Sequence, residues 1–376
     1  MLKPVISRAW KYSVRAFRVE IGRATVRNVT RMSKEDVHAL VTRSAQEQEV
    51  RPLDLLITRK IRSRAHSSHP ATAHYNSRSR NGAAEYCIKI FDTSSDEKRT
   101  FFDREAELLE KLSQHKLANS APMTPAVRLA HPTTGVLVME WLEGTSLKSD
   151  LMIANYRSDR RNHLLRMSAQ WLRKFHEVSG IQRKQVDALE MLNKLQADIS
   201  KLTDRQQEQL RADNITISAV DLLRERAASI KGSLFEWGLH HRDFTPSNLI
   251  VSPKGEAIRG FDLGKATDIA PVSFDLATFT IRAWDISAAL MLKRTRAGEV
   301  RLSEIMDAVL NGYNPELSEA DRNWISWCVL HKSINRKLQY YKTRDMVANW
   351  NIARYMQSYL MGQKTSRFVQ AACDRF

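Results

Sequence analysis

The spacing of apolar and polar residues divides the chain into a strand-rich stretch and a longer helical one. Between residues 53 and 142, short apolar runs predict strands at 53–57, 71–75, 85–91, 127–129 and 135–142. Asn81-Gly82 lies between the second and third runs and predicts a tight hairpin, because both residues tolerate positive φ angles. Glu143-Gly144 ends the last run. Beyond residue 145 the pattern is mostly helical, with short strands expected at 249–251 and 258–261.

Two helices are predicted in the first third of the chain. Ser33 is followed three residues later by Asp36, which is typical of a capped helix start. This helix is expected to end near residue 48, ahead of Arg51-Pro52. The second helix is expected over 102–112, where apolar residues form a stripe.

Composition excludes several classes of protein. Apolar residues make up 43% of the 376 residues, which is enough for a core and argues against global disorder. No run of 18 apolar residues predicts a membrane-spanning helix. The three cysteines, Cys87, Cys328 and Cys373, lack the spacing of a disulfide framework or a metal site, and they favour a reducing compartment.

The net charge of +17 is concentrated at the two ends of the chain. Residues 1–80 hold 17 Lys/Arg against 6 Asp/Glu, and residues 281–376 hold 15 against 9. Basic ends around a neutral centre suggest an anionic partner such as lipid, phosphorylated glycan or nucleic acid. The alternative is a solvated basic surface without a dedicated partner.

Residues 1–32 combine eight Lys/Arg and one acid, Glu20, with apolar residues near helical spacing. Such a segment is typical of a basic amphipathic helix on an anionic membrane. A helix packed on the body of the protein and an Arg-rich transit peptide are the alternatives.

Four elements suited to phosphoryl transfer follow one another along the chain. Lys89, on the strand at 85–91, can neutralise the phosphates of a nucleotide, and Glu105, on the next helix, can hold that lysine in place. The loop His241-Arg242-Asp243-Phe244-Thr245-Pro246-Ser247-Asn248 offers a base and, five residues on, a metal ligand. Asp262, in Phe261-Asp262-Leu263-Gly264, follows a short strand and offers a second metal ligand. Positioning and charge neutralisation are nearly the whole of this chemistry.

The ordered set resembles the protein-kinase-like signature. More closely, it is similar to the aminoglycoside phosphotransferase and choline kinase superfamily, in which His-x-Asp-x-x-x-x-Asn precedes a strand and a metal-binding Asp. Phe274-Asp275-Leu276-Ala277 looks like that group's following-helix motif. Bacterial lipopolysaccharide core sugar kinases have a similar motif set. The resemblance covers residues 53–290, and the ends carry no motif.

The resemblance implies a role for each matching residue. Asp243 would be the catalytic base or orient the acceptor hydroxyl, with Asn248 and Asp262 as Mg²⁺ ligands. His241 would brace the loop from inside the core, and Asp275 would hold it through hydrogen bonds. ATP would be held by Lys89, with Glu105 or its competitor Glu107 beside it, and by a hinge whose backbone meets adenine, formed by Met139, Glu140, Trp141 and Leu142.

One feature departs from the kinase pattern: no Gly-x-Gly-x-x-Gly lies between the first two strands. Their expected connection, Arg62–Pro70, is rich in hydroxyls and positive charge. It could hold phosphates through Ser hydroxyls and Arg side chains. A mobile exposed loop is the equal alternative.

The expected fold is α+β and bilobal, a protein-kinase-like fold with a small antiparallel-sheet N-lobe and a large helical C-lobe. A basic helical extension is expected at 1–52, the N-lobe with its hinge at 53–142, and the C-lobe at 143–376, including inserted acceptor-binding helices at about 183–233.

The expected function is transfer of the γ-phosphate of ATP to a hydroxyl of a small molecule or a glycan, lipid-linked glycans included. Only 13 positions separate Asp262 from Asp275, too few for a peptide-docking activation segment. The inserted segment holds 9 Lys/Arg and 8 Asp/Glu, so no acidic cradle for a cationic acceptor is evident. These counts favour an anionic or membrane-associated acceptor, and a cytoplasmic enzyme with peripheral contact at the inner membrane surface.

Two alternatives stay open. A pseudokinase-like scaffold would use the fold for binding alone, although it has no need of filled base and metal positions. A kinase for proteins, or one associated with nucleic acid, is suggested by the charge, but no recognised nucleic-acid-binding motif is present.

Overall fold

The computed structural model describes residues 29, 31–50, 55–64, 71–82, 84–117, 120–154, 157–266, 268–291, 302–347 and 368–373. The chain divides into two compact units. The first comprises Met1–Glu143 and Phe261–Lys265, and the second comprises Gly144–Gly260 and Ala266–Phe376. Each unit is described separately below.

A five-stranded antiparallel sheet of order β1-β2-β3-β5-β4 forms the centre of the first unit. Its strands are β1 (Leu55–Arg64), β2 (Thr72–Ser79), β3 (Glu85–Phe91), β4 (Val127–His131) and β5 (Val136–Glu140). The predicted hairpin at Asn81-Gly82 is confirmed, with Gly82 at a φ of +71° between β2 and β3. One boundary was wrong, because β1 continues to Arg64, so the connection predicted from Arg62 begins later.

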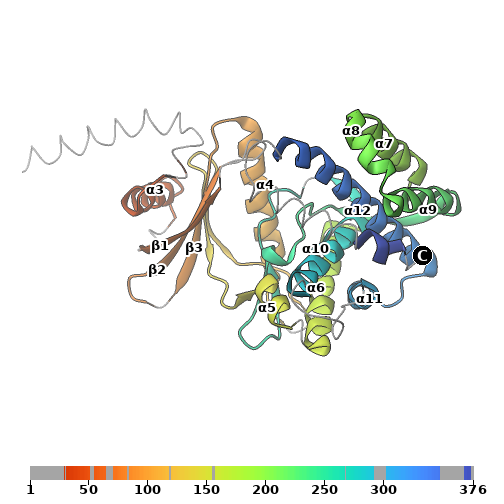
Figure 1. Ribbon diagram of the computed structural model, residues 1–376. Helices are drawn as coiled ribbons and strands as arrows, with labels where there is room; N and C mark the ends of the chain where they lie inside the picture. The colour runs from red at the N-terminus through yellow and green to blue at the C-terminus, as the bar shows by residue number, and fades with distance from the viewer. Residues whose placement is uncertain are drawn as a thin grey trace, which may run out of the picture. The chain divides into compact units, whose positions relative to one another are not determined.

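Two helices of the first unit lie on opposite faces of this sheet (Figure 1). Along β3, side chains alternate between the two faces. Ile88 and Ile90 belong to a buried apolar cluster shared with helix α3 (Lys34–Glu47), whereas Lys89 contacts helix α4 (Asp96–Ser113). The sheet is thus covered on one face by α3 and carries its polar chemistry on the other.

Both helices start at capping side chains. The predicted capping box of α3 is present, because the Asp36 amide donates to Ser33 Oγ and the Ser33 amide donates to the Asp36 carboxylate. Helix α4 starts six residues before the predicted Phe102, because Ser95 caps it by accepting a hydrogen bond from the Lys98 amide. The first turn of α4 is polar and adds nothing to the apolar stripe, so the spacing of apolar residues did not predict this turn.

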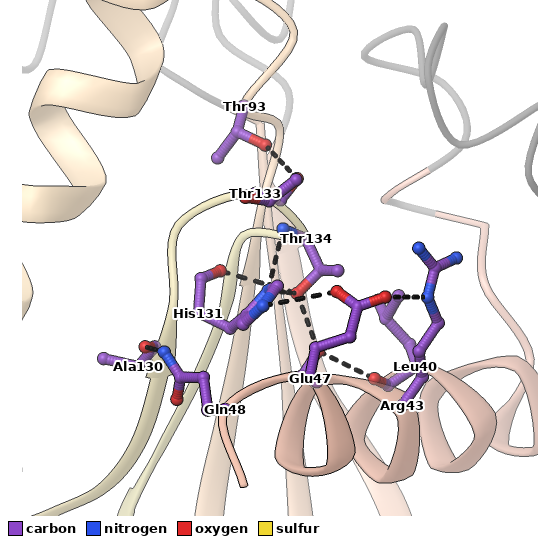
Figure 2. A network of polar contacts seen from close by, with 10 residues as sticks. Leu40, Arg43, Glu47, Gln48, Thr93, Ala130, His131, Thr133 and Thr134 are labelled. Carbon is purple, nitrogen blue, oxygen red and sulfur yellow. Dashed lines mark hydrogen bonds and ion pairs between the residues drawn. The ribbon is translucent and has the colours of Figure 1, made fainter.

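Polar contacts also attach α3 to the turn between β4 and β5 (Figure 2). Ser44 Oγ and Thr134 Oγ1 lie 2.7 Å apart, and His131 Nδ1 lies 2.9 Å from the same Thr134 oxygen. Burial lowers the pKa of His131, while the Glu47 carboxylate, 3.4 Å from His131 Nε2, acts in the opposite direction. Helix α3 therefore packs on the core of the first unit. Residues 1–28 lie outside the described residues.

The second unit is built mainly of helices. They are α5 (Leu147–Ala154), α6 (Ser158–Ser179), α7 (Ala188–Ser200), α8 (Asp204–Arg211), α9 (Asn214–Ile230), α10 (Ser273–Met291), α11 (Leu302–Tyr313) and α12 (Glu319–Val347), with a 3₁₀ turn η1 (Pro246–Asn248). Helix α6 packs against α11, α10 against α12, and the inserted helices α7 and α8 against α9. Helix α9 in turn packs against α12, which ties the insertion to the body of the unit (Figure 1).

Two small sheets in the second unit were only partly predicted. The expected strands are present as β9 (Leu249–Val251) and β10 (Ile258–Gly260), and β9 pairs with β10 on one side and with β6 (Thr145–Ser146) on the other. The prediction missed β6 and the whole sheet of β7 (Gln182–Gln185), β8 (Leu234–Leu239) and β11 (Ile269–Pro271). All residues of β7 are exposed and polar, so no alternation marks this strand. Among the described residues, none of the helices is long and apolar enough to cross a membrane.

Candidate active site

Three predicted residues meet in the first unit as a buried ion cluster. Lys89 Nζ donates to both oxygens of Glu105, at 2.6 and 2.8 Å, and to Asp262 Oδ1 at 2.7 Å. Lys89 is 2% exposed and Glu105 is fully buried. Burial by itself lowers the pKa of the Lys89 ammonium, but the carboxylates of Asp262 and Glu105 outweigh burial and raise the pKa above its usual value. The lysine therefore stays charged while held between two acids.

Of the two glutamates considered for Lys89, the structure pairs Glu105 with it. Glu107 is exposed on α4, on the other side of the helix. Residues two apart on a helix do not share a face, so only one of the pair can reach the sheet.

Asp262 reaches this cluster through a strained backbone. Its φ is +67°, a region that Asp visits more readily than most residues. Gly264, two residues on, packs against the Phe101 ring so closely that a Cβ would lie 2.2 Å from a ring carbon. A larger side chain at this position would have to displace the Phe101 ring, so the glycine lets the segment lie close against α4.

In the second unit, the loop that carries Asp243 is fastened to an aromatic core. Phe244 and His241 are fully buried. The Phe244 ring stacks on Trp171, with centroids 5.6 Å apart, and His241 packs edge-on against both rings. This packing confirms that His241 braces the loop from inside. Asp243 follows the exposed Arg242 and precedes the buried Phe244, and it is itself partly exposed.

Asp275 holds the same loop through its backbone. It accepts hydrogen bonds from the amides of His241 at 2.8 Å and Arg242 at 3.1 Å, which confirms the predicted bracing role. Arg242 has a φ of +63°, a conformation that needs such support. Burial by itself would raise the pKa of Asp275, but the hydrogen bond from His176 and the neighbouring imidazoles lower it to about 2.

The sequence did not reveal the polar network behind Asp275. His176 Nε2 lies 3.3 Å from the Asp275 carboxylate, and its Nδ1 lies 2.9 Å from the Tyr313 hydroxyl. His240 Nε2 lies 3.3 Å from the other Asp275 oxygen. These residues come from α6, α11 and the end of β8, far apart in sequence and without a shared motif. Only His240, next to the loop motif, gave any local signal.

Asn248 and Asp262 offer ligand types that suit Mg²⁺. The Asn248 amide nitrogen donates to the Asp243 carbonyl at 3.0 Å, which leaves its side-chain oxygen as the group suited to a cation. Magnesium prefers carboxylate and amide oxygens, and it completes its shell with water and substrate phosphates. The residues present thus fit the ion. No cluster of three or more His, Cys, Asp or Glu suited to a metal occurs in the described part of the chain.

The predicted hinge is only partly strand. Met139 and Glu140 close β5, and Trp141 and Leu142 follow it, half-buried. The Glu140 amide donates to the Ala126 carbonyl and the Trp141 amide to the Glu85 carbonyl. A base placed at this segment would therefore meet other backbone groups than these two amides.

Comparisons with known proteins agree with this chemistry. A family model described as the phosphotransferase enzyme family matches residues 72–307. No curated protein matches the sequence. Among solved structures, a glucosamine kinase in complex with glucosamine, ADP and inorganic phosphate has a TM-score of 0.53 at 12% identity, covering 92% of this chain and 88% of that one. This likeness confirms the kinase-like fold.

Two further structures are similar at lower scores. The ethanolamine kinase of Plasmodium vivax has a TM-score of 0.47 at 13% identity, covering 92% of this chain and 90% of its own. A spectinomycin phosphotransferase in complex with ADP and spectinomycin has a TM-score of 0.49 at 14% identity, covering 84% of this chain and 93% of its own.

Proposed function

The chain belongs to the phosphotransferase enzyme family, and we propose that it transfers the γ-phosphoryl group of ATP to a hydroxyl of a small molecule or glycan, lipid-linked glycans included. The observation that carries this proposal is the buried Lys89–Glu105–Asp262 cluster. A fully buried lysine between two carboxylates is costly to maintain without a use for its charge. Phosphoryl transfer uses both signs of charge, the cation for phosphate oxygens and the acid for a metal ion.

Each residue of the proposed site has one task. Lys89 positions the nucleotide phosphates and neutralises their charge, and Glu105 keeps the ammonium in place. Asp262 and Asn248 would hold Mg²⁺, which when bound supplies positive charge to the phosphate oxygens. The backbone of Met139–Leu142 would receive the adenine.

Asp243 acts on the acceptor. Its carboxylate accepts a hydrogen bond from the acceptor hydroxyl, which orients the oxygen toward the γ-phosphorus. As the new oxygen–phosphorus bond forms, the bond to the β-phosphate oxygen breaks, ADP leaves and the hydroxyl proton passes to Asp243. The buried neighbours Phe244 and His241 fix the loop, so that the carboxylate is positioned before the acceptor arrives.

The test is an acceptor screen that follows ADP release with ATP and Mg²⁺. The panel should contain cationic amino sugars and amino alcohols, neutral sugars, sugar phosphates and uronic acids, and lipid-linked glycans. We expect acceptor-dependent ADP release with at least one class, and none with the Asp243→Asn variant. A wild-type protein that neither binds ATP nor releases ADP with any class would contradict the proposal.

A further inference from the structure

Two helices of the second unit present facing polar stripes beside the loop that carries Asp243. On α10, residues four apart share a face, and Phe274 and Thr278 both lie partly exposed there. On α12, Lys332 faces them, with Nζ 2.7 Å from Thr278 Oγ1 and 5.4 Å from the centroid of the Phe274 ring. One helical turn earlier, Cys328 Sγ lies 3.3 Å from Ser273 Oγ, which fixes the register of the two helices.

Lys332 has no carboxylate partner among the described residues. Its hydrogen-bond partner is one hydroxyl, although an ammonium carries three N–H donors. Burial lowers the pKa of Lys332, and the charge of Asp275 offsets this effect only in part. A half-buried cation of this kind lowers the stability of the fold, because a charge removed from water is normally paired. This cost is expected where the cation serves a ligand.

The next turn of both helices adds further positive charge. Arg336, four residues after Lys332, lies 2.6 Å from Asp285 of α10, and Arg282 shares the same carboxylate at 3.8 Å. Lys332, Arg282 and Arg336 are thus three cations against two acids, Asp285 and the nearby Asp275, which leaves an excess of one positive charge. The facing stripes therefore attract an anion and repel a cation.

The Phe274 ring connects this cluster to the loop of Asp243. It packs against Lys332 on one side and edge-on against His240, with ring centroids 5.9 Å apart. Asp275, the next residue, accepts from the amides of His241 and Arg242. Lys332 is thus separated from the backbone of the Asp243 loop by a single layer of side chains.

We propose that Lys332, held in place by the Thr278 hydroxyl and with Phe274 as an apolar wall, recognises an oxyanion group, a phosphate or a carboxylate, carried by the acceptor. This proposal rests on the proposed function and names its substrate class: a hydroxyl compound that already bears a negative charge. Such an acceptor must be the product of an earlier enzyme reaction, which either attaches a phosphate to it or generates a carboxylate on it.

Equilibrium dialysis of the full chain, saturated with ADP and Mg²⁺ so that the nucleotide phosphates are already in place, tests the assignment. The ligands are glucose 6-phosphate, glucuronate, glucose and glucosamine. We expect either or both anionic sugars to bind about tenfold or more tightly than glucose, and the two anions separate a phosphate from a carboxylate site. Lys332→Met should weaken the anion's binding by about 10- to 100-fold, the usual effect of losing a charge-assisted hydrogen bond. Lys332→Arg should restore part of the affinity.

Lys342→Met is the matched control, since it removes the same charge from the same helix. It should leave anion binding unchanged, and Lys332→Met should not lower the melting temperature. The proposal is overturned if neither anionic sugar binds more tightly than glucose and glucosamine. It is also overturned if both lysine variants weaken the anion equally, or if Lys332→Met unfolds the protein, which would make the lysine structural. Acceptor-dependent ADP release from ATP tests phosphoryl transfer separately, so failure of the anion site alone leaves that proposal standing.

Discussion

At the scale of single residues, the candidate active site contains residues whose burial or backbone conformation lowers the stability of the fold. Lys89 is a fully buried cation, and its two carboxylates repay the loss of hydration through short hydrogen bonds. Asp262 adds a left-handed backbone conformation to the same cluster. Such features persist where function requires them, and here they coincide with the residues that the sequence assigned to phosphoryl transfer.

Glu105 and Glu107 provide a matched pair of variants on one helix. Glu105→Gln removes a buried charge from Lys89 and should lower kcat/KM by about 100-fold or more, because the lysine loses its fixed position. It should also lower the free energy of unfolding by about 1–3 kcal/mol, the cost of a disrupted buried hydrogen bond. Glu107→Gln, at an exposed position, should change stability by less than about 0.5 kcal/mol and leave turnover unchanged. Steady-state kinetics and urea unfolding measure both; equal losses in the two variants would mean that the pairing is wrong.

At the scale of elements, Asp275 joins α10 to the loop after β8. Its pKa of about 2 lies below the ordinary value of 3.8, so the folded state holds the carboxylate ionised more strongly than the unfolded state does. The resulting stability is fully present above about pH 4 and is lost as the pH falls toward 2. A difference of nearly two units corresponds to about 2–3 kcal/mol.

We therefore expect the Asp275→Asn variant to lose stability in a pH-dependent way. Between pH 5 and 7 the variant should unfold at a lower urea concentration than the wild type. The margin, the difference between the two urea midpoints, should be constant over this range. Below about pH 4 the margin should narrow, because the unfolded wild-type chain then takes up a proton at Asp275 while the folded chain does not, which removes the stability that the lowered pKa supplies. Urea titrations at pH 7, 5, 4 and 3 measure this margin. A margin that stays constant down to pH 3 would show that Asp275 does not stabilise the loop through its charge.

The sequence predicted helices and strands correctly where a buried face makes apolar residues recur at a regular spacing. All five strands of the first sheet and the capped helix at Ser33 were expected from alternation and turn residues. The sheet of β7, β8 and β11 was missed because its edge strands are short or polar, and β7 and β11 pair with a strand about 30 to 55 residues away in sequence. His176 and Lys332 were missed for a related reason, since each gains its role from a partner about 50 or more residues away.

At the scale of the whole molecule, the charge is uneven in a way that the fold does not require. Residues 1–28 hold seven Lys/Arg and one acid, and Val29, the first described residue, is buried in the core of the first unit. A basic segment of this kind gains about 1 kcal/mol from anionic lipid for each cation near the surface. We expect it to attach the protein reversibly to an anionic membrane.

Deleting residues 1–28, a cut that ends before Val29, should separate membrane contact from folding. The full chain should sediment with vesicles that contain phosphatidylserine at low salt and be released as the ionic strength rises. The truncated chain should stay in the supernatant while keeping the melting temperature and the ATP affinity of the full chain. Membrane attachment through this segment would be contradicted if the truncated protein still sediments with the vesicles, or if the full-length protein does not.

The most direct test of the account is turnover in Asp243→Ala, measured with any acceptor that the screen identifies and compared with nucleotide binding in the same variant. Asp243 is partly exposed, and the loop is packed through the buried side chains of His241 and Phe244, so removing the carboxylate leaves this packing in place. We expect kcat to fall by about 100- to 10,000-fold, the range for a lost general base. The Kd of ATP should change by less than about threefold, because the phosphates are held by other residues. Turnover close to that of the wild type would contradict phosphoryl transfer at this loop.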